Sequence, residues 1–297
     1  MPSLKVIRRR IVSVKSTQKI TKAMKMVAGA RLNRAQQAIT AMRPYAVKTG
    51  EILRSVAARG EGDDAEGTEA LHPFLDARPE KSALIVLFSG DRGLCGAFNT
   101  NVNKTAERRW RELEGEGKKV AFVTVGRKGR EYLSRRKANI VQDFPRPYEQ
   151  LDLAKARSVA QAIAAKLKAK EFDSVTLVFN EFKSAITQKA TLSPLFPLPA
   201  KERAAHAGEL HTEFLFEPDK RALLNQLVPM YLEITIFRAM LESQAGFFGA
   251  QMTAMDSATR NAKDMIGRLS LAYNRARQAA ITKELMEIIG GAEALKE

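Results

Sequence analysis

Apolar residues recur every three or four positions through the first 58 residues of the chain, which predicts a long amphipathic helix. Three stripes can be followed: Leu4, Ile7, Ile11 and Val14; then Ile20, Met24 and Val27; then Ala28, Leu32, Ala35, Ile39 and Met42. The phase slips across the polar residues 15–19, which predicts a buried face that rotates along the helix. Pro44 is expected near a bend or a restart, with helix resuming to about Ala58.

The middle of the chain alternates between two patterns. Short runs rich in strand formers predict strands at 83–89, 120–125 and 174–182, and helical patterns lie between them at 101–113, 127–136 and 153–170. The segment 192–200 is broken by prolines and is expected to be an edge strand or an exit loop. Strands that alternate with helices indicate a parallel or mixed sheet with helices on its faces.

From Leu223 the chain reads as one very long helix. Steps of three and four residues from Leu224 to Ala280 visit 17 positions, of which 15 are apolar. A seam that averages 3.5 residues per turn predicts a left-handed supercoil with a partner helix.

The predicted fold class is therefore α/β plus a long antiparallel α-helical coiled coil. The two terminal helices pair, and a Rossmann-like α/β domain is inserted between them, giving a rod with a globular foot. The expected domains are 1–58, the N-terminal coiled-coil helix; 59–80, an acidic, Gly-rich loop and linker; 81–205, the α/β foot domain; 206–222, a linker; and 223–297, the C-terminal coiled-coil helix.

Charge is concentrated at the start of the chain. The net charge is +16, and residues 1–50 hold 12 Lys and Arg with no acid before Glu51. A segment of one sign usually meets a negative partner. The segment has one aromatic residue, Tyr45, so stacking platforms for nucleic acid and aromatic anchors for a membrane surface are lacking. An acidic protein partner fits best.

Catalytic chemistry is poorly represented. The segment "SGDRGLCGAFN" (89–99) places glycines between a strand and a helix, where a phosphate can bind, but its spacing matches neither a dinucleotide fingerprint nor a Walker loop. A tight structural turn is favoured. The single cysteine, Cys95, has no evident His partner and is expected to pack, and the three scattered histidines form no metal cluster.

Two other classes of function stay open at this point. One is a basic coiled-coil protein that binds nucleic acid, and the other is a nucleotide enzyme built around 89–99. The apolar runs are too short for a membrane span, and the start "MPSLKVIRRRIV" lacks the apolar block of a secretory signal, so a cytoplasmic location is expected.

Four motifs carry a resemblance along the full length: "RRRIVSVKSTQKITKAMKMVA" (8–28), "DRGLCGAFN" (91–99), "FEPD" (216–219) and "YNRARQAAITKELMEIIGGAEAL" (273–295). The chain resembles the gamma subunit, or central stalk, of the bacterial rotary F-type ATP synthase. The resemblance implies a non-catalytic rotor shaft without a cofactor, which couples ion-driven ring rotation to ATP synthesis or hydrolysis. The implied partners are three alpha and three beta subunits, the epsilon subunit and the membrane c-ring, at the cytoplasmic face of the inner membrane as a peripheral protein.

The resemblance also implies contact residues. The beta-subunit levers and loop would meet Lys22, Met24, Lys25, Val27, Arg277, Gln278 and Thr282; the apolar sleeve of the hexamer would meet Ile288, Ile289 and Leu295; and Glu217 would face the ring and epsilon. A basic helix face opposite acidic beta loops would hold the two in electrostatic register while they slide.

One segment departs from the family pattern. Where members usually read like "ASEHAARM", this chain reads "AGFFGAQM" (245–252). Acid, histidine and arginine positions have become Phe247, Phe248 and Gln251. Any ion pair made there is lost, and we expect a more apolar contact or a local loosening of the shaft.

Overall fold

The computed structural model describes residues 3–58, 72, 74, 79–149, 151–197 and 220–294. The chain divides into two compact units: Met1–Ala28 with Gln251–Glu297, here the terminal unit, and Gly29–Ala250, here the sheet unit. Two helices contribute to both units, α1 (Leu4–Ala58) and α6 (Lys220–Ala294).

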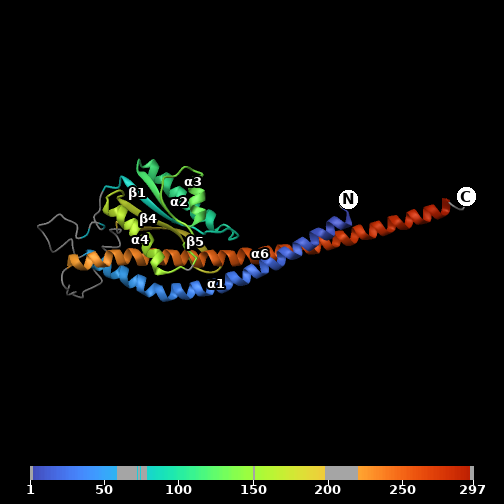
Figure 1. Ribbon diagram of the computed structural model, residues 1–297, viewed down its shortest axis with the longest axis horizontal. Helices are drawn as coiled ribbons and strands as arrows, with labels where there is room; N and C mark the ends of the chain where they lie inside the picture. Colours follow the sequence, from blue (N-terminus) through green and yellow to red (C-terminus); the bar gives the residue numbers. More distant parts are fainter. Residues whose placement is uncertain are drawn as a thin grey trace. The chain divides into compact units, whose positions relative to one another are not determined.

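The sheet unit is built on five strands in the order β3-β2-β1-β4-β5. Figure 1 labels β1, β4 and β5 of this sheet. The strands are β1 (Ser82–Phe88), β2 (Lys119–Val125), β3 (Ile140–Phe144), β4 (Ser174–Phe182) and β5 (Gln188–Phe196). The connecting helices are α2 (Phe98–Gly115), α3 (Arg127–Ser134) and α4 (Leu153–Lys168). Neighbours among β3, β2, β1 and β4 pair in parallel, and β5 pairs antiparallel to β4.

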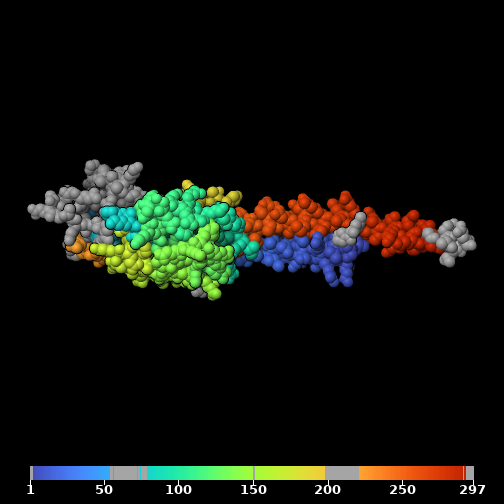
Figure 2. Space-filling view, turned by 90° about the horizontal axis from the view of Figure 1, so that it is seen from above, coloured from blue at the N-terminus to red at the C-terminus, as the bar shows by residue number. Residues whose placement is uncertain are grey.

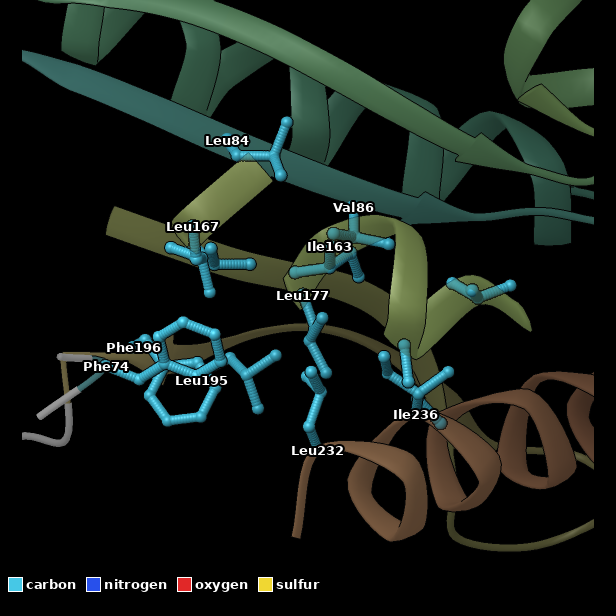
Figure 3. Close-up of a cluster of buried hydrophobic side chains, with 14 of the residues drawn as sticks. Phe74, Leu84, Val86, Ile163, Leu167, Leu177, Leu195, Phe196, Leu232 and Ile236 are labelled. Carbon is cyan, nitrogen blue, oxygen red and sulfur yellow. The ribbon is translucent and has the colours of Figure 1, made fainter. Parts of the chain in front are cut away.

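Both faces of the sheet are covered, which explains why β1 is a continuous apolar run. Leu84, Val86 and Phe88 of β1 point into a core shared with α4 and α6 (Figure 3). The alternate residues Ala83, Ile85 and Leu87 point into a second core with α2 and α3. The strand therefore serves two cores at once, because successive side chains point to opposite faces.

The predicted α/β region and the long C-terminal helix are confirmed. Apart from the segment 192–200, the predicted strands and helices agree with the observed ones to within three residues at each end. Strand β3 was missed because it has only five residues, is half-buried throughout and carries Gln142 and Asp143 in its interior.

The expectation for 192–200 is confirmed as an edge strand, although β5 begins earlier, at Gln188, and residues 198–200 lie outside the described part of the chain. Pro194 is exposed and sits opposite Thr176, next to a register shift in the β4–β5 pairing. Proline has no backbone N–H group to donate to a neighbouring strand. It is tolerated at this position because edge strands and bulges do not need that hydrogen bond.

Of the two expectations for Pro44, a bend or a restart, the restart is wrong, because α1 runs through Pro44 without interruption. The bend stays a prediction. Pro44 and Thr40, four residues before it, are both exposed, so water can satisfy the carbonyl group that the proline leaves without an amide donor.

The rotating stripe predicted for α1 is also wrong. Ile20 and Val27 are exposed by 57% and 53%, whereas Thr21 is buried. One phase of buried and half-buried positions instead continues along the helix to Met42, with Met24, Gly29, Gln36 and Ala38 half-buried beside it. This phase consists of Leu4, Ile7, Ile11, Val14, Gln18, Thr21, Lys25, Ala28, Leu32, Ala35, Ile39 and Met42. This seam is continuous. Its polar residues, Gln18, Thr21 and Lys25, lie within or just after the stretch in which the apolar pattern shifts phase.

Candidate subunit interface

In the terminal unit, α1 and α6 are joined by polar contacts on this seam. The Thr21 and Thr259 hydroxyls lie 2.8 Å apart and share a hydrogen bond. One helical turn away, Lys25 Nζ donates to Asp256 Oδ1 at 2.5 Å. Asp256 also pairs with Arg260 at 3.2 Å. These contacts fix which residues of the two helices lie opposite each other.

The Asp256 carboxylate is kept in its ionised form by the hydrogen bond and the positive charges of its neighbours. The hydrogen bond from Lys25 is the main cause that lowers the pKa of Asp256, and the nearby charge of Arg260 adds to it. The carboxylate therefore stays ionised well below neutral pH and keeps the ion pair closed.

The four candidate lever residues on α1 divide into two groups. Lys22 and Val27 are exposed, so both are open to a partner, whereas Met24 and Lys25 are half-buried. The Lys25 ammonium is already held by Asp256. Of the two lysines, Lys22 is thus the one that presents an uncommitted charge among the described residues.

The candidate residues on α6 form a separate group. Arg277, Gln278 and Thr282 are exposed, and the Thr282 hydroxyl donates to the Gln278 carbonyl at 3.0 Å. Twenty-one residues separate Asp256 from Arg277, which is about 30 Å along a helix. The two groups therefore do not form one site.

The end of α6 presents an apolar surface. Ile288 and Ile289 are exposed by 71% and 53%, and Ile281, Leu285 and Met286 are exposed beside them. In Figure 2 the red end of α6 continues past the blue side chains of α1 in this unit. Exposed apolar side chains in such number are typical of a contact with another molecule. The other two candidates, Leu295 and Glu217, lie outside the described residues.

Thr21 and Asp256 were not predicted from the sequence as interhelical contacts, whereas Thr259 is one of the 17 seam positions between Leu224 and Ala280. The signal was available, because Thr21 and Lys25 fall on the period of 3.5 that runs from Leu4 to Met42. It was passed over because the polar residues 15–19 were read as a shift of the buried face to another side of the helix.

The Gly-rich turn at 89–99 is filled by the protein itself. The Gly90 amide donates to Asn99 Oδ1 at 2.8 Å, and a Cβ atom at Gly90 would lie 2.9 Å from Phe247 Cδ2. Asp91 Oδ1 accepts from the amides of Arg127 and Arg146, both at 3.1 Å. The turn thus ties strand ends together, which supports the structural interpretation over a phosphate site.

Cys95 packs in the same turn. Its side chain is buried against Phe98 and Ala250, and Asn99 Nδ2 donates to its sulfur at 3.3 Å. Burial raises the pKa of the Cys95 thiol, so little thiolate is present at neutral pH.

We expect Cys95 to react with an aromatic disulfide reagent at least about tenfold more slowly in the native chain than in urea. The release of the coloured thiol, followed at neutral pH, measures both rates. Equal rates in the two conditions would show that the thiol is accessible and would contradict the packing described here.

The departing segment 245–252 is helical throughout. Phe247 packs edge-to-face on Phe98 with ring centroids 5.8 Å apart, and the Arg31 guanidinium lies 5.7 Å from the Phe248 centroid. The segment is therefore turned toward the protein's own α1 and α2, and the apolar contact expected there is made within the sheet unit.

Among the described residues, no group of three or more His, Cys, Asp or Glu side chains is placed to hold a metal ion. The helices within those same ranges include none that is both long enough and apolar enough to cross a membrane.

Comparison with known proteins gives full-length matches. A sequence model of a family described as ATP synthase matches residues 3–295. The ATP synthase gamma chain of Sorangium cellulosum is 52% identical over 323 aligned residues, and that of Trichlorobacter lovleyi is 47% identical over 296; in each case the match covers 100% of both chains.

Solved structures share the fold. A chain of the Euglena gracilis mitochondrial ATP synthase (OSCP/F1/c-ring, rotational state 3) superposes with a TM-score of 0.66 at 19% identity, covering 98% of this chain and 94% of that one. A chain of the Tetrahymena thermophila mitochondrial ATP synthase central stalk and c-ring gives 0.60 at 24% identity, covering 80% and 99%. With the family match and the full-length relatives together, the chain belongs to the ATP synthase gamma chain family.

Proposed function

We propose that this chain is the central rotor shaft of an F-type ATP synthase. It would couple ion-driven rotation of a membrane ring to ATP synthesis or hydrolysis at a hexamer of alpha and beta subunits. The observation that carries the proposal is the 52% identity to a gamma chain over the whole of both chains. A gamma chain is a non-catalytic subunit, so the chemistry belongs to the beta subunits and the shaft changes their nucleotide affinity by asymmetric contact.

The finer architecture belongs to the same proposal. The continuous seam on α1 and the period of 3.5 on α6 support an antiparallel coiled coil formed by the segments 1–58 and 223–297. The strand order β3-β2-β1-β4-β5 supports a Rossmann-like description of the domain at 81–205. The predicted linkers 59–80 and 206–222 belong to the same proposal, except that residues 220–222 are already part of α6.

The basic face of α1 would meet acidic beta-subunit levers, with Lys22 and Val27 as its most accessible members. Long lysine side chains favour sliding between equivalent positions, because their contacts are weak and easily exchanged. Met24 and Lys25 would support that face, while Arg277, Gln278 and Thr282 would bind a beta-subunit loop.

The exposed apolar end of α6, with Ile288 and Ile289, would turn inside the sleeve of the hexamer, and Leu295 would extend that surface. Apolar contact without fixed hydrogen bonds suits a bearing, because it gives no single preferred angle. Glu217 would face the ring and the epsilon subunit. The complex would sit at the cytoplasmic face of the bacterial inner membrane, with this chain peripheral to it.

Assembly tests the proposal directly. The full chain is mixed with the alpha and beta subunits of the same organism and with nucleotide, and the products are weighed by native mass spectrometry. We expect a complex of three alpha, three beta and one gamma chain. If alpha and beta subunits of proven competence leave the chain unbound, the proposal fails, and salt-sensitive binding of DNA or RNA by the free chain would then favour the nucleic-acid alternative.

A further inference from the structure

Residues 246–249 of α6, here the key segment, interlock with loops of the sheet unit. The Phe247 ring occupies the space above Gly90, where a Cβ atom would lie 2.9 Å and 3.1 Å from two of its carbons. The same ring packs on Phe98 at an interplanar angle of 79°. Phe247 is thus a projection that enters a hollow left by a missing side chain.

The two glycines of the key segment are the reverse: hollows that other residues enter. A Cβ atom at Gly246 would lie 3.0 Å from Phe98 Cε2, and one at Gly249 would lie 3.1 Å from the carbonyl oxygen of Ala185 and 3.2 Å from its Cα. Ala185 belongs to the turn between β4 and β5, and Gln188 Nε2 donates to its carbonyl at 3.0 Å. Glycine is a poor helix former, so close approach explains its presence here.

The directions in which these contacts lie around α6 decide whether the helix can rotate about its own axis. Successive residues lie about 100° apart around a helix, so Phe247 points about 100° to one side of Gly246, and Gly249 about 60° to the other. The contacts therefore spread over roughly 160° of the circumference of α6. A helix held on two flanks cannot roll in either direction without moving a neighbour. The hollows at Gly246 and Gly249, one turn apart, also oppose sliding along the axis.

We propose that the key segment fixes the rotational position of α6 against the α/β domain and carries torque between them. The residues that act are Phe247 in the hollow at Gly90, and Phe98 and Ala185 in the hollows at Gly246 and Gly249. The inference rests on the proposed function of the chain as a rotor. It assigns a mechanical role within the chain to residues 246–249, which are four of the five positions where the segment 245–252 departs from the family pattern.

The test uses the full chain assembled with its alpha and beta subunits. A probe particle is attached through Ser134→Cys, on an exposed position of α3, in a Cys95→Ala background. Rotation is stalled, and the angular variance of the probe reports the torsional stiffness of the path from the domain to the hexamer. Phe247→Ala and Gly249→Ala are compared with Phe247→Leu, which keeps an apolar projection, and with Gly115→Ala, whose new Cβ atom meets nothing within 4 Å.

We expect Phe247→Ala and Gly249→Ala to increase the angular variance roughly twofold, Phe247→Leu to restore most of the stiffness, and Gly115→Ala to leave it unchanged. In the free chain, hydrogen exchange at the Gly90 amide and in the β4–β5 turn should become about tenfold faster in the first two variants. A purely structural role would lower the urea midpoint without changing the variance.

If the assembled variants keep the parent's variance, the inference is overturned while the proposed function stands. If the parent chain itself fails to assemble with competent partners, the proposed function is overturned and the torque role with it. The two failures are therefore distinguishable.

Discussion

Replacing Gly126 by alanine should leave little folded protein. Gly126 has a φ of +106°, and a Cβ atom there would lie only 2.0 Å from the Ser89 carbonyl oxygen and 2.9 Å from its carbonyl carbon. Both neighbours are backbone, and the Gly126 amide donates to the Phe144 carbonyl at 3.0 Å. Relief of the clash must therefore disturb the parallel strands, at a cost above about 4 kcal/mol.

Gly117 provides the matched control. It also has a positive φ, +76°, but a Cβ atom there meets nothing within 4 Å. Gly117→Ala should cost only about 1 kcal/mol, which is the strain of a left-handed alanine. Urea unfolding of both variants, followed by circular dichroism, measures the difference. A Gly126→Ala chain that unfolds within about 1 kcal/mol of the Gly117→Ala chain would refute the close approach.

The sheet unit was predictable to the extent that its residues follow simple periods. The run "ALIVLFS" is apolar throughout because both faces of β1 are buried, and such a run bounded by a Gly turn identifies a central strand. Strand β3 carries no such signal, because an edge strand with half-buried residues such as Gln142 and Asp143 resembles a loop. That β3 pairs in parallel with β2 can be inferred only once the strand order of the sheet is known.

The seam between α1 and α6 shows a different limit of prediction from sequence. Periodicity located α6 and the overall extent of α1, but the polar residues 15–19 were read as a phase slip, so Thr21 and Lys25 were not placed on the seam. What makes them acceptable lies more than 200 residues away, in Thr259 and Asp256. The period of 3.5 places Thr21 and Lys25 on the seam, but it does not show which residues of α6 they meet. For the same reason, the sequence does not show that Phe247 packs into the space above Gly90.

Reversing the charge at Lys25 should separate α1 from α6 in the terminal unit. Lys25→Glu places a second carboxylate against Asp256, in a contact now 2.5 Å long, one turn from the Thr21–Thr259 hydrogen bond. Like charges at that distance repel, so the amides of α1 before Gly29 should lose protection from hydrogen exchange. The double variant Lys25→Glu with Asp256→Lys restores the opposite charges and should restore protection.

Lys22→Glu separates this effect from contact with a partner. Lys22 is exposed and its charge is uncommitted among the described residues, so its reversal should leave exchange in α1 unchanged. In the assembled complex, the proposed contact with acidic beta-subunit levers predicts that the same variant weakens a salt-sensitive interaction and lowers the rate of ATP hydrolysis. Loss of protection in Lys22→Glu, or none in Lys25→Glu, would contradict the assignment of the two lysines.

Acid should reproduce the Lys25→Glu effect in the unmodified chain. The pKa of Asp256 lies below its ordinary value of 3.8, chiefly because Lys25 donates to it. A lowered pKa in the folded state means that the pair contributes its full stability above pH 3.8 and loses it as the pH falls through the lowered value. The protection factors of the α1 amides, which compare the measured rate with the intrinsic rate at the same pH, should therefore fall below about pH 4 in the parent but not in Asp256→Asn, which has no carboxylate to protonate.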